Sequence, residues 1–425
     1  MFSLLHGRSI SATTHVLPLI FAWQVAFAQD VTIRWKGEVR VRGEVDGRDF
    51  RSSTPANTYV LLRARFGAEI QPTENTQVVL QLQDARVFGE EKAGSSFSTI
   101  ANTKNLDLRL AYVTIDDLVI PGLNASVGRM ALSYGGERLI GTVDWNNIGR
   151  VFDGALLRYQ WSSQSIDLFV ANTGETTVPP SVTTRTAVAG VRDSGETVSG
   201  INWTLRTEDK RQFDIYLFHQ WNRNQSVRGH DDVSRFTGGT YVKGSIDELD
   251  YEAEFAYQIG TLSRMDIGAF LLSGSFRYIL GQSALTSIGV GYDYLSGTAL
   301  GSTDYQSFDP SFHTGHKFYG FMDYFVNIPA NTNSRGLQDF FLEGVVRPSE
   351  TTSILLRGHY FALAEPWSGA RDLGGEIDLV GAVNYDTNVS FEAGASAFFP
   401  AFVMRAWFNG DDVAMWGYFT TRVWF

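Results

Sequence analysis

Two stretches of this 425-residue sequence combine arginines with acidic residues in a way that could bind a carboxylate ligand or form a network of ion pairs. The first stretch, residues 128–154, reads GRMALSYGGERLIGTVDWNNIGRVFDG. Its glycines predict a tightly folded loop, because glycine adopts backbone conformations that other residues avoid. A guanidinium group binds a carboxylate through two parallel hydrogen bonds, so these side chains could contact an acidic ligand. They could equally pin the loop to itself, since such networks are often structural. The candidates are Arg129, Arg138, Asp144, Arg150 and Asp153, with Glu137 beside them.

The second stretch, TIRWKGEVRVRGE at residues 32–44, alternates apolar and charged side chains, and residues 58–70 alternate in the same way. A period of two is typical of a β-strand, whose successive side chains point to opposite faces of a sheet. Charged faces that line a pore favour anions when Arg and Lys dominate, although Glu38, Glu44 and Glu69 balance part of this charge. The alternative is a network of ion pairs that stiffens the wall. The residues predicted to line the path are Arg34, Lys36, Arg40, Arg42, Arg63 and Arg65.

Catalytic and metal-binding chemistry finds little support in the sequence. His313 and His316 are three residues apart, but no Cys/His cluster and no glutamate at metalloprotease spacing accompanies them. The sequence contains no nucleophile elbow of the G-x-S-x-G type. Several tryptophans fall at expected strand ends, which is typical of the aromatic girdle of a membrane barrel. We therefore expect no enzymatic activity, no metal and no cofactor.

The N-terminus and the composition indicate an exported protein. Residues 1–28 combine a single charge, an apolar stretch and the sequence AFA, which is typical of a secretory signal peptide, and residues 29–425 are expected to form one domain. The chain has a net charge of −11 and no cysteine, which argues against general nucleic-acid binding and excludes disulfides. No later apolar run is long enough for a helical membrane span. Alternating strands of a barrel remain possible, because their mean hydropathy is nearly neutral.

Strand-like alternation recurs along the chain, and the connections between strands divide into two classes. Short turns such as 207–211 and 385–388 alternate with long polar loops such as 133–150 and 297–336. Outer-membrane barrels have short periplasmic turns and long extracellular loops, whereas a soluble sandwich has no reason to separate them. We therefore predict an all-β, antiparallel transmembrane β-barrel of about 18 strands, with both termini periplasmic. The strand-like run 317–328 is assigned to an outer loop, which could carry its own hairpin.

The last ten residues, WGYFTTRVWF, alternate as a final strand. Phe425 ends the chain on the same parity as Phe419 and Val423, the set expected to face lipid. A terminal aromatic residue on that face resembles the signal read by the outer-membrane barrel assembly machinery, although an ordinary strand can also end in Phe. We therefore expect two partners for this chain, the assembly machinery and the outer-membrane lipid.

A set of short motifs is dense over residues 31–171 and continues in patches to about residue 345. The motifs are Gln83-Asp84-Ala85-Arg86, Ala111-Tyr112-Val113, Gly128-Arg129, Tyr134-Gly135, Arg138-Leu139-Ile140-Gly141, Asp144-Trp145, Gly149-Arg150, Phe152-Asp153-Gly154, His316, Tyr319-Gly320, Asp323, Gly336-Leu337 and Asp339. Together they resemble the alginate export family of outer-membrane barrels. The resemblance implies a barrel of about 18 strands whose arginine-lined constriction passes an anionic polysaccharide, and it adds Arg86 to the predicted path. The alginate exporter closes its pore with a long periplasmic loop near the C-terminus, whereas the corresponding turn here, YDTN at 385–388, is very short.

Two functions are compatible with such a barrel. The first is passive export of an anionic polysaccharide or its oligosaccharides, since guanidinium groups bind carboxylates. The second is a general or nutrient-uptake porin that admits small solutes. An outer-membrane enzyme would need a catalytic group at one rim, and the sequence identifies none. A soluble sugar-binding sandwich is the remaining alternative.

Overall fold

The computed structural model describes residues 31–89, 104–176, 194–222, 233–281 and 285–425. The predicted signal peptide lies outside these ranges, so the division into a signal peptide and one barrel domain stays a prediction. Among the described residues, none of the helices has the length and the apolar character needed to cross a membrane.

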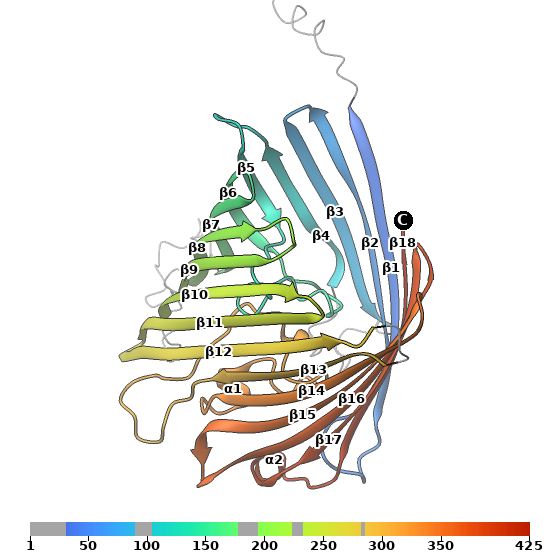
Figure 1. Ribbon diagram of the computed structural model, residues 1–425, viewed down its shortest axis with the longest axis vertical. Helices are drawn as coiled ribbons and strands as arrows, with labels where there is room; N and C mark the ends of the chain where they lie inside the picture. Colours follow the sequence, from blue (N-terminus) through green and yellow to red (C-terminus); the bar gives the residue numbers. More distant parts are fainter. Residues whose placement is uncertain (1–30, 90–103, 177–193, 223–232, 282–284) are drawn as a thin grey trace, which may run out of the picture.

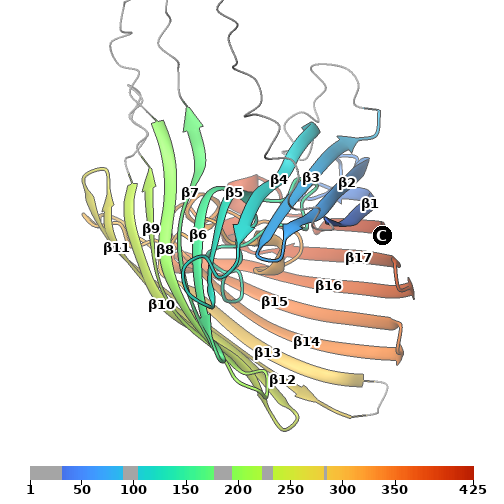
Figure 2. The same cartoon turned by 90° about the horizontal axis from the view of Figure 1, so that it is seen from above.

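The described residues form a closed antiparallel β-barrel (Figure 1, Figure 2). Its strands are β1 (Thr32–Gly47), β2 (Asn57–Thr73), β3 (Thr76–Val87), β4 (Lys104–Ile115), β5 (Leu123–Met130), β6 (Phe152–Trp161), β7 (Gln164–Thr176), β8 (Ser194–Arg206), β9 (Gln212–Asn222), β10 (Val233–Ile246), β11 (Leu249–Leu262), β12 (Met265–Ile279), β13 (Leu285–Leu295), β14 (Leu337–Ser349), β15 (Thr352–Trp367), β16 (Ala370–Asp386), β17 (Val389–Pro400) and β18 (Ala414–Trp424). Neighbours in sequence pair with one another, and β1 closes the barrel by pairing with both β2 and β18. The predicted fold class and the count of 18 strands are confirmed.

The alternation of β1 shows why these residues form a membrane barrel. Ile33, Trp35 and Val39 point outward and are 46%, 61% and 41% exposed, whereas Arg40 and Arg42 point inward and are buried. A soluble sandwich would bury the apolar face. The outward apolar face here suits lipid, and the charged face lies inside the barrel.

The two ends of the barrel differ in their connections. We call the end that carries Thr32 and Phe425 the short-turn end, because its connections are short; such turns are periplasmic in outer-membrane barrels. The opposite end carries the long loops. Two connections there, 263–264 and 368–369, are also short, so the predicted alternation of short and long connections is not strict. Ser263 has a positive φ of 54°, as tight hairpin turns require.

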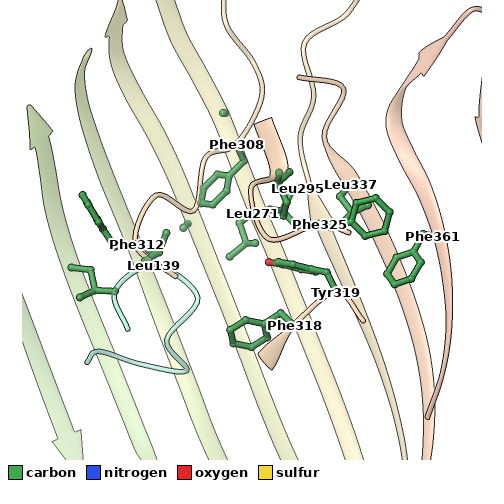
Figure 3. Close-up of a cluster of buried hydrophobic side chains, with 14 of the residues drawn as sticks. Leu139, Leu271, Leu295, Phe308, Phe312, Phe318, Tyr319, Phe325, Leu337 and Phe361 are labelled. Carbon is green, nitrogen blue, oxygen red and sulfur yellow. The ribbon is translucent and has the colours of Figure 1, made fainter. Parts of the chain in front are cut away.

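Two long loops fold into the barrel. Residues 131–151 join β5 to β6, and residues 296–336 join β13 to β14. Apolar side chains of both loops pack against inward-facing wall residues, so a hydrophobic core lies inside the barrel (Figure 3). The loops contribute Leu139, Phe308, Phe312, Phe318, Tyr319 and Phe325, and the strands contribute Leu271, Leu295, Leu337 and Phe361.

The loop over residues 296–336 contains no strand, as the assignment of 317–328 to a loop requires. It also contains no hairpin; its regular structure is a 3-10 turn at Gly315–Lys317 and the one-turn helix α1 (Ile328–Asn331). A second short helix, α2 (Phe402–Phe408), lies in the connection between β17 and β18. Apolar packing against the wall and isolated backbone bridges, such as those of Tyr305 with Ile267 and of Phe312 with Ile140, fix the path of the longer inward loop.

The barrel wall is shorter at β5 and β6, the two strands that the shorter inward loop connects. β5 has 8 residues and β6 has 10. β4 pairs with β5 only from Ala111 to Ile115, so the remainder of β4 has no β5 partner. The chain consequently enters the barrel well below the height that β4 and β7 reach.

Candidate functional site

Six arginines and three carboxylates gather on one side of the barrel interior, and we call them the arginine cluster. The strands place them by register: Arg40 of β1 lies opposite Arg63 of β2 and Arg422 of β18. Inward alternation on three neighbouring strands therefore brings like charges into one row, a costly arrangement unless acceptors intervene. The members of the cluster are Arg40, Arg42, Arg63, Arg65, Arg109, Arg422, Glu38, Glu44 and Asp144.

The shorter inward loop supplies many of those acceptors through its backbone. Arg63 Nη1 donates to the carbonyl oxygens of Asp144 at 2.8 Å and Asn146 at 2.9 Å. Arg40 donates to the same two carbonyls at 3.0 and 2.9 Å. Arg42 Nη1 donates to the carbonyl of Trp145 at 2.8 Å, and its guanidinium carbon lies 4.2 Å from the centre of the indole. The arginines thus anchor the loop inside the barrel.

The carboxylates neutralise the most buried guanidinium groups. Glu38 lies between Arg63, with Nη2 at 2.6 Å from Oε1, and Arg422. Asp144 Oδ1 lies 2.6 Å from Arg65 Nη1. Part of the cluster is therefore the stiffening network that the sequence left open as an alternative.

Positive charge nevertheless remains in excess. Arg40 Nε, Arg65 Nη2 and Arg109 Nε are buried atoms without a hydrogen-bond partner in the described part of the chain. Buried polar groups normally have hydrogen-bond partners, and a buried donor without one costs free energy. A solute carboxylate could accept from these donors, because a guanidinium group accepts no hydrogen bond and offers five.

Asp144 lies in the loop over residues 131–151, outside the strands. Burial by itself would raise the pKa of its carboxyl, but the guanidinium groups of Arg63 and Arg65 outweigh burial and lower the pKa to about 2. The cluster therefore keeps this carboxylate charged in all but strong acid.

We expect acid to loosen the loop within a defined window. The pKa of folded Asp144 lies below the ordinary value of 3.8, so its stabilisation is complete above about pH 4 and is lost as the pH falls toward 2. The free energy of unfolding, measured against pH, should fall more steeply across that window for the native chain than for Asp144→Asn. Equal slopes would contradict the assignment.

Arg34 and Lys36 lie apart from the cluster. Both are exposed near the short-turn end of β1, and Lys36 forms an ion pair with Glu69. Exposed pairs of this kind contribute little to stability. Their place on the barrel suits a role at its mouth and not at a constriction.

Three predicted path residues point outward, and for these the prediction is wrong. Arg129 lies opposite Asp153 in the pairing of β5 with β6, and their side chains form an ion pair at 2.6 Å on the face that exposes Val127. No register shift interrupts that pairing, so strict alternation sends both side chains outward. Arg86 shares the outward face of β3 with Leu82 and binds Asp84, with Nη2 2.8 Å from Oδ2.

Arg138 and Arg150 join the two inward loops and do not belong to the arginine cluster. Arg138 Nη1 lies 2.8 Å from Asp293 Oδ2 of β13, and its guanidinium carbon lies 4.1 Å from the ring centre of Phe318. Burial would lower the pKa of Arg138, but Asp293 outweighs it and raises the pKa above its usual range. Arg150 donates to the carbonyl of His313 at 3.0 Å, and burial lowers its pKa to about 10.

Two arginines of the cluster, Arg109 and Arg422, were absent from the predicted path. Arg109 alternates with the outward Leu106 and Leu108, which was a usable signal. A register shift in the pairing of β3 with β4 follows at this point, and such a bulge re-aims side chains. Arg422 shares the inward parity of Tyr418 and Thr420, so the same rule would have found it.

The two histidines of the longer loop have structural surroundings. His316 stacks on Trp145 with ring centres 3.9 Å apart, and its Nδ1 lies 2.9 Å from Asp323 Oδ1. His313 is buried, and this lowers its pKa to about 4, with the charge of Arg150 acting in the same direction. Within the described ranges, no group of three or more His, Cys, Asp or Glu side chains could hold a metal ion.

This chain resembles known outer-membrane proteins in sequence and in fold. A family model described as "Alginate export" matches residues 31–406. Similar solved structures include OccK5 (OpdH) of Pseudomonas aeruginosa, which is 13% identical with a TM-score of 0.56 over 92% of this chain and 97% of that chain. OccAB4 of Acinetobacter baumannii is 10% identical with a TM-score of 0.60 over 92% and 98%. A BenF-like porin from Pseudomonas fluorescens Pf-5 is 10% identical with a TM-score of 0.59 over 94% and 99%. No match was found among curated proteins.

Proposed function

This chain belongs to the alginate export family and is an outer-membrane channel, and from this premise we propose that it passes an anionic polysaccharide or its oligosaccharides along the arginine cluster. The observation that carries the proposal is the excess of guanidinium groups over carboxylates on one side of the barrel interior. A chain of sugar carboxylates can exchange between neighbouring arginines, each accepting two hydrogen bonds in turn. The proposal assigns the protein no catalytic step.

Passive transport sets a limit on how tightly the cluster binds. A channel must attract its solute enough to admit it and weakly enough to release it. Loop carbonyls and Asp144 already occupy most of the donors, so a passing carboxylate competes with them and binds weakly. Arg40, Arg65 and Arg109 each keep one buried donor without a partner, which a solute carboxylate reaches only when it displaces the contacts of the inward loop.

We expect the double variant Arg65→Gln/Arg109→Gln to lose anion preference. Loss of about 1 kcal/mol of attraction in a water-filled path corresponds to roughly a fivefold lower ratio of anion to cation permeability. The ratio is measured from the reversal potential of the purified barrel in a planar bilayer under a salt gradient. Arg34→Gln is the matched control, because this arginine is exposed and lies outside the cluster. An unchanged ratio in the double variant, or cation selectivity in the native chain, would overturn the proposal.

A second candidate is a porin for small solutes. It is favoured by the apolar core that the two inward loops build inside the barrel, which reduces the room for a polymer. Uronate oligomers of increasing length separate the two functions. The polysaccharide channel should be blocked more strongly by longer oligomers, whereas the porin should respond to a single sugar acid and lose block once the oligomer is too long to enter.

A further inference from the structure

The longer inward loop is attached to the barrel wall through a buried carboxyl group of β16. Glu376 is 1% exposed, and its Oε1 accepts a hydrogen bond from the backbone N–H of Met322 at 2.8 Å. A Cβ on Gly320 would lie 2.6 Å from Glu376 Oε2, so the loop backbone packs directly against this carboxyl. Asp378 lies two residues further along the same inward face of β16. We call Glu376, Asp378 and the amide of Met322 the loop latch.

The two carboxyls of the loop latch are in contact with each other. Asp378 has no exposed surface, and the side chains of Glu376 and Asp378 lie within hydrogen-bonding reach. Asp378 Oδ1 accepts a hydrogen bond from the hydroxyl of Ser396 on β17. Among the residues that the structure describes, no group donates to the two remaining oxygens, Glu376 Oε2 and Asp378 Oδ2. Two neighbouring acceptors are therefore left facing each other without a donor between them.

A proton is the one donor that fits this place. Both oxygens are buried, so a solute does not reach them while the loop is in position. Phe398 lies opposite Glu376 on β17, is fully buried and stacks on Phe361 with ring centres 5.9 Å apart. Two ionised carboxylates in such apolar surroundings would repel each other and lack solvation. A carboxyl that keeps its proton instead donates to its ionised neighbour.

The cationic groups nearest the loop latch are engaged elsewhere. On β15, His359 lies opposite Glu376 and Arg357 lies opposite Asp378. Arg357 directs Nε and Nη2 to Glu343, at 3.0 and 2.6 Å. His359 Nδ1 lies 2.8 Å from Asp339 Oδ1, whereas its Nε2 lies 3.7 Å from Asp378 Oδ2, too far for a hydrogen bond. An imidazolium at His359 would balance only one of the three acids around it.

The inward loop and the other strands bring no free cation to the carboxyls. Arg48 donates to the carbonyl of Met322 at 3.0 Å, but its Nη2 lies 2.7 Å from Asp46 Oδ2. Asp323 adds a further acid beside Glu376 and is hydrogen-bonded to His316. The remaining titratable groups that face the pair are the hydroxyls of Tyr324 and Tyr418. A shared proton is thus the simplest way to stabilise the two carboxyls.

We propose that Glu376 and Asp378 share one proton, that this proton keeps the longer inward loop attached to β16, and that alkaline conditions release the loop and widen the channel. Release exposes both carboxyls to water, where an ordinary carboxyl ionises above about pH 4. The attached state therefore holds one proton more than the released state at neutral pH, and its stability falls as the pH rises. The inference concerns the opening of the channel and holds for any solute.

The test records single channels of the purified full-length barrel in a planar bilayer from about pH 5 to about pH 9. The ratio of the released, more conducting state to the attached state should rise by up to about tenfold per pH unit in the native chain. Glu376→Gln should abolish this response and stay attached, because its amide oxygen still accepts from Met322 while its NH₂ donates permanently to Asp378. Asp378→Asn should act alike, with its NH₂ donating to Glu376.

A matched control removes a different carboxylate from the same loop. Asp304 is exposed and lies away from β16 in the loop over residues 296–336, so Asp304→Asn should keep the native response to pH. Glu376→Ala loses the acceptor for Met322 and should be released at every pH. A native channel whose conductance does not change with pH, or an unchanged response in both amide variants, would overturn the proposal.

Infrared spectroscopy tests the proton itself. At neutral pH the native barrel should show the C=O absorption of a protonated carboxyl, and the band should weaken in both Glu376→Gln and Asp378→Asn and persist in Asp304→Asn. A native spectrum without this band would overturn the shared proton even if the channel responds to pH. If the amide variants fail to fold, the native spectrum and the native response to pH decide.

Discussion

Arg63→Gln is expected to lower the free energy of unfolding by about 3–5 kcal/mol, the cost of breaking a buried ion pair by removing one partner. Arg63 has no exposed surface. Its guanidinium group binds Glu38 and the carbonyls of Asp144 and Asn146 at once. A glutamine amide offers two donors and no charge, so it cannot serve both the carboxylate and the loop. Urea unfolding of the barrel in lipid vesicles, followed by tryptophan fluorescence, measures the loss.

The same variant should release the loop over residues 131–151. Single-channel recordings should then show more frequent current fluctuations than the native barrel, because the loop loses two of its backbone anchors. Arg211→Gln is the matched control: Arg211 also pairs with an acid, Asp209, but it lies in a short turn with its side chain 48% exposed. Exposed pairs contribute about 1 kcal/mol or less. If Arg63→Gln costs no more than Arg211→Gln, the cluster does not anchor the loop.

The anchored loop determines which segments occupy the interior of this barrel. The turn between β16 and β17 is short, so the long periplasmic loop of the alginate exporter has no counterpart there. The two inward loops occupy the interior instead and meet where His316 stacks on Trp145. Arg42 covers the same indole, so the arginine cluster and the contact between the loops form one unit. A carboxylate that competes for these arginines would act directly on the loop that narrows the channel.

Sequence reasoning succeeds here where a single rule operates over many residues. The period of two in β1 predicts which side chains face lipid, because the strands of a membrane barrel turn an apolar face outward. The inner face is polar in β1, whereas β12 to β15 also carry apolar side chains there that pack against the longer inward loop. Applied to β5, the same rule points Arg129 outward; treating residues 128–154 as one loop hid this, and so did the family motif that contains Arg129. Arg86 fails for the same reason, since its motif says nothing about the face on which it lies.

The inward loops show where such reasoning stops. A loop of mixed polarity has no period, and nothing in residues 131–151 alone states that their carbonyls will meet Arg40 and Arg63. These contacts join residues about a hundred positions apart, and they form because the loop between β5 and β6 folds across the interior to β1 and β2. Asp293, Asp339 and His359 likewise lie on separate strands, so only the register of the sheet brings them together.

The pairing of β1 with β18, which closes the barrel, ends in a contact at Phe425. Gly37 N–H donates to the carbonyl of Phe425 at 2.8 Å, and Phe425 N–H donates back at 3.1 Å. A Cβ on Gly37 would lie 2.2 Å from Phe425 Cζ, so the aromatic ring fills the space that the missing side chain leaves. The ring is 65% exposed on the outward face. It can therefore serve closure, recognition by the barrel assembly machinery, or both.

Two variants separate these roles. Phe425→Ala keeps both backbone hydrogen bonds and removes the ring, so spontaneous folding into lipid vesicles should weaken by no more than about 1–2 kcal/mol. If the machinery reads the ring, as we propose, the amount of assembled barrel in cells should nevertheless collapse. Gly37→Leu displaces the ring without removing it, and overpacking of this kind costs about 1–3 kcal/mol; its stability in vesicles should fall while assembly in cells largely persists. Urea unfolding in vesicles and the yield of heat-modifiable barrel in outer membranes measure the two effects. Recognition by the machinery requires the ring but not its contact with Gly37. Parallel losses in both assays for both variants would therefore show that the ring acts only by stabilising the pairing of β1 with β18.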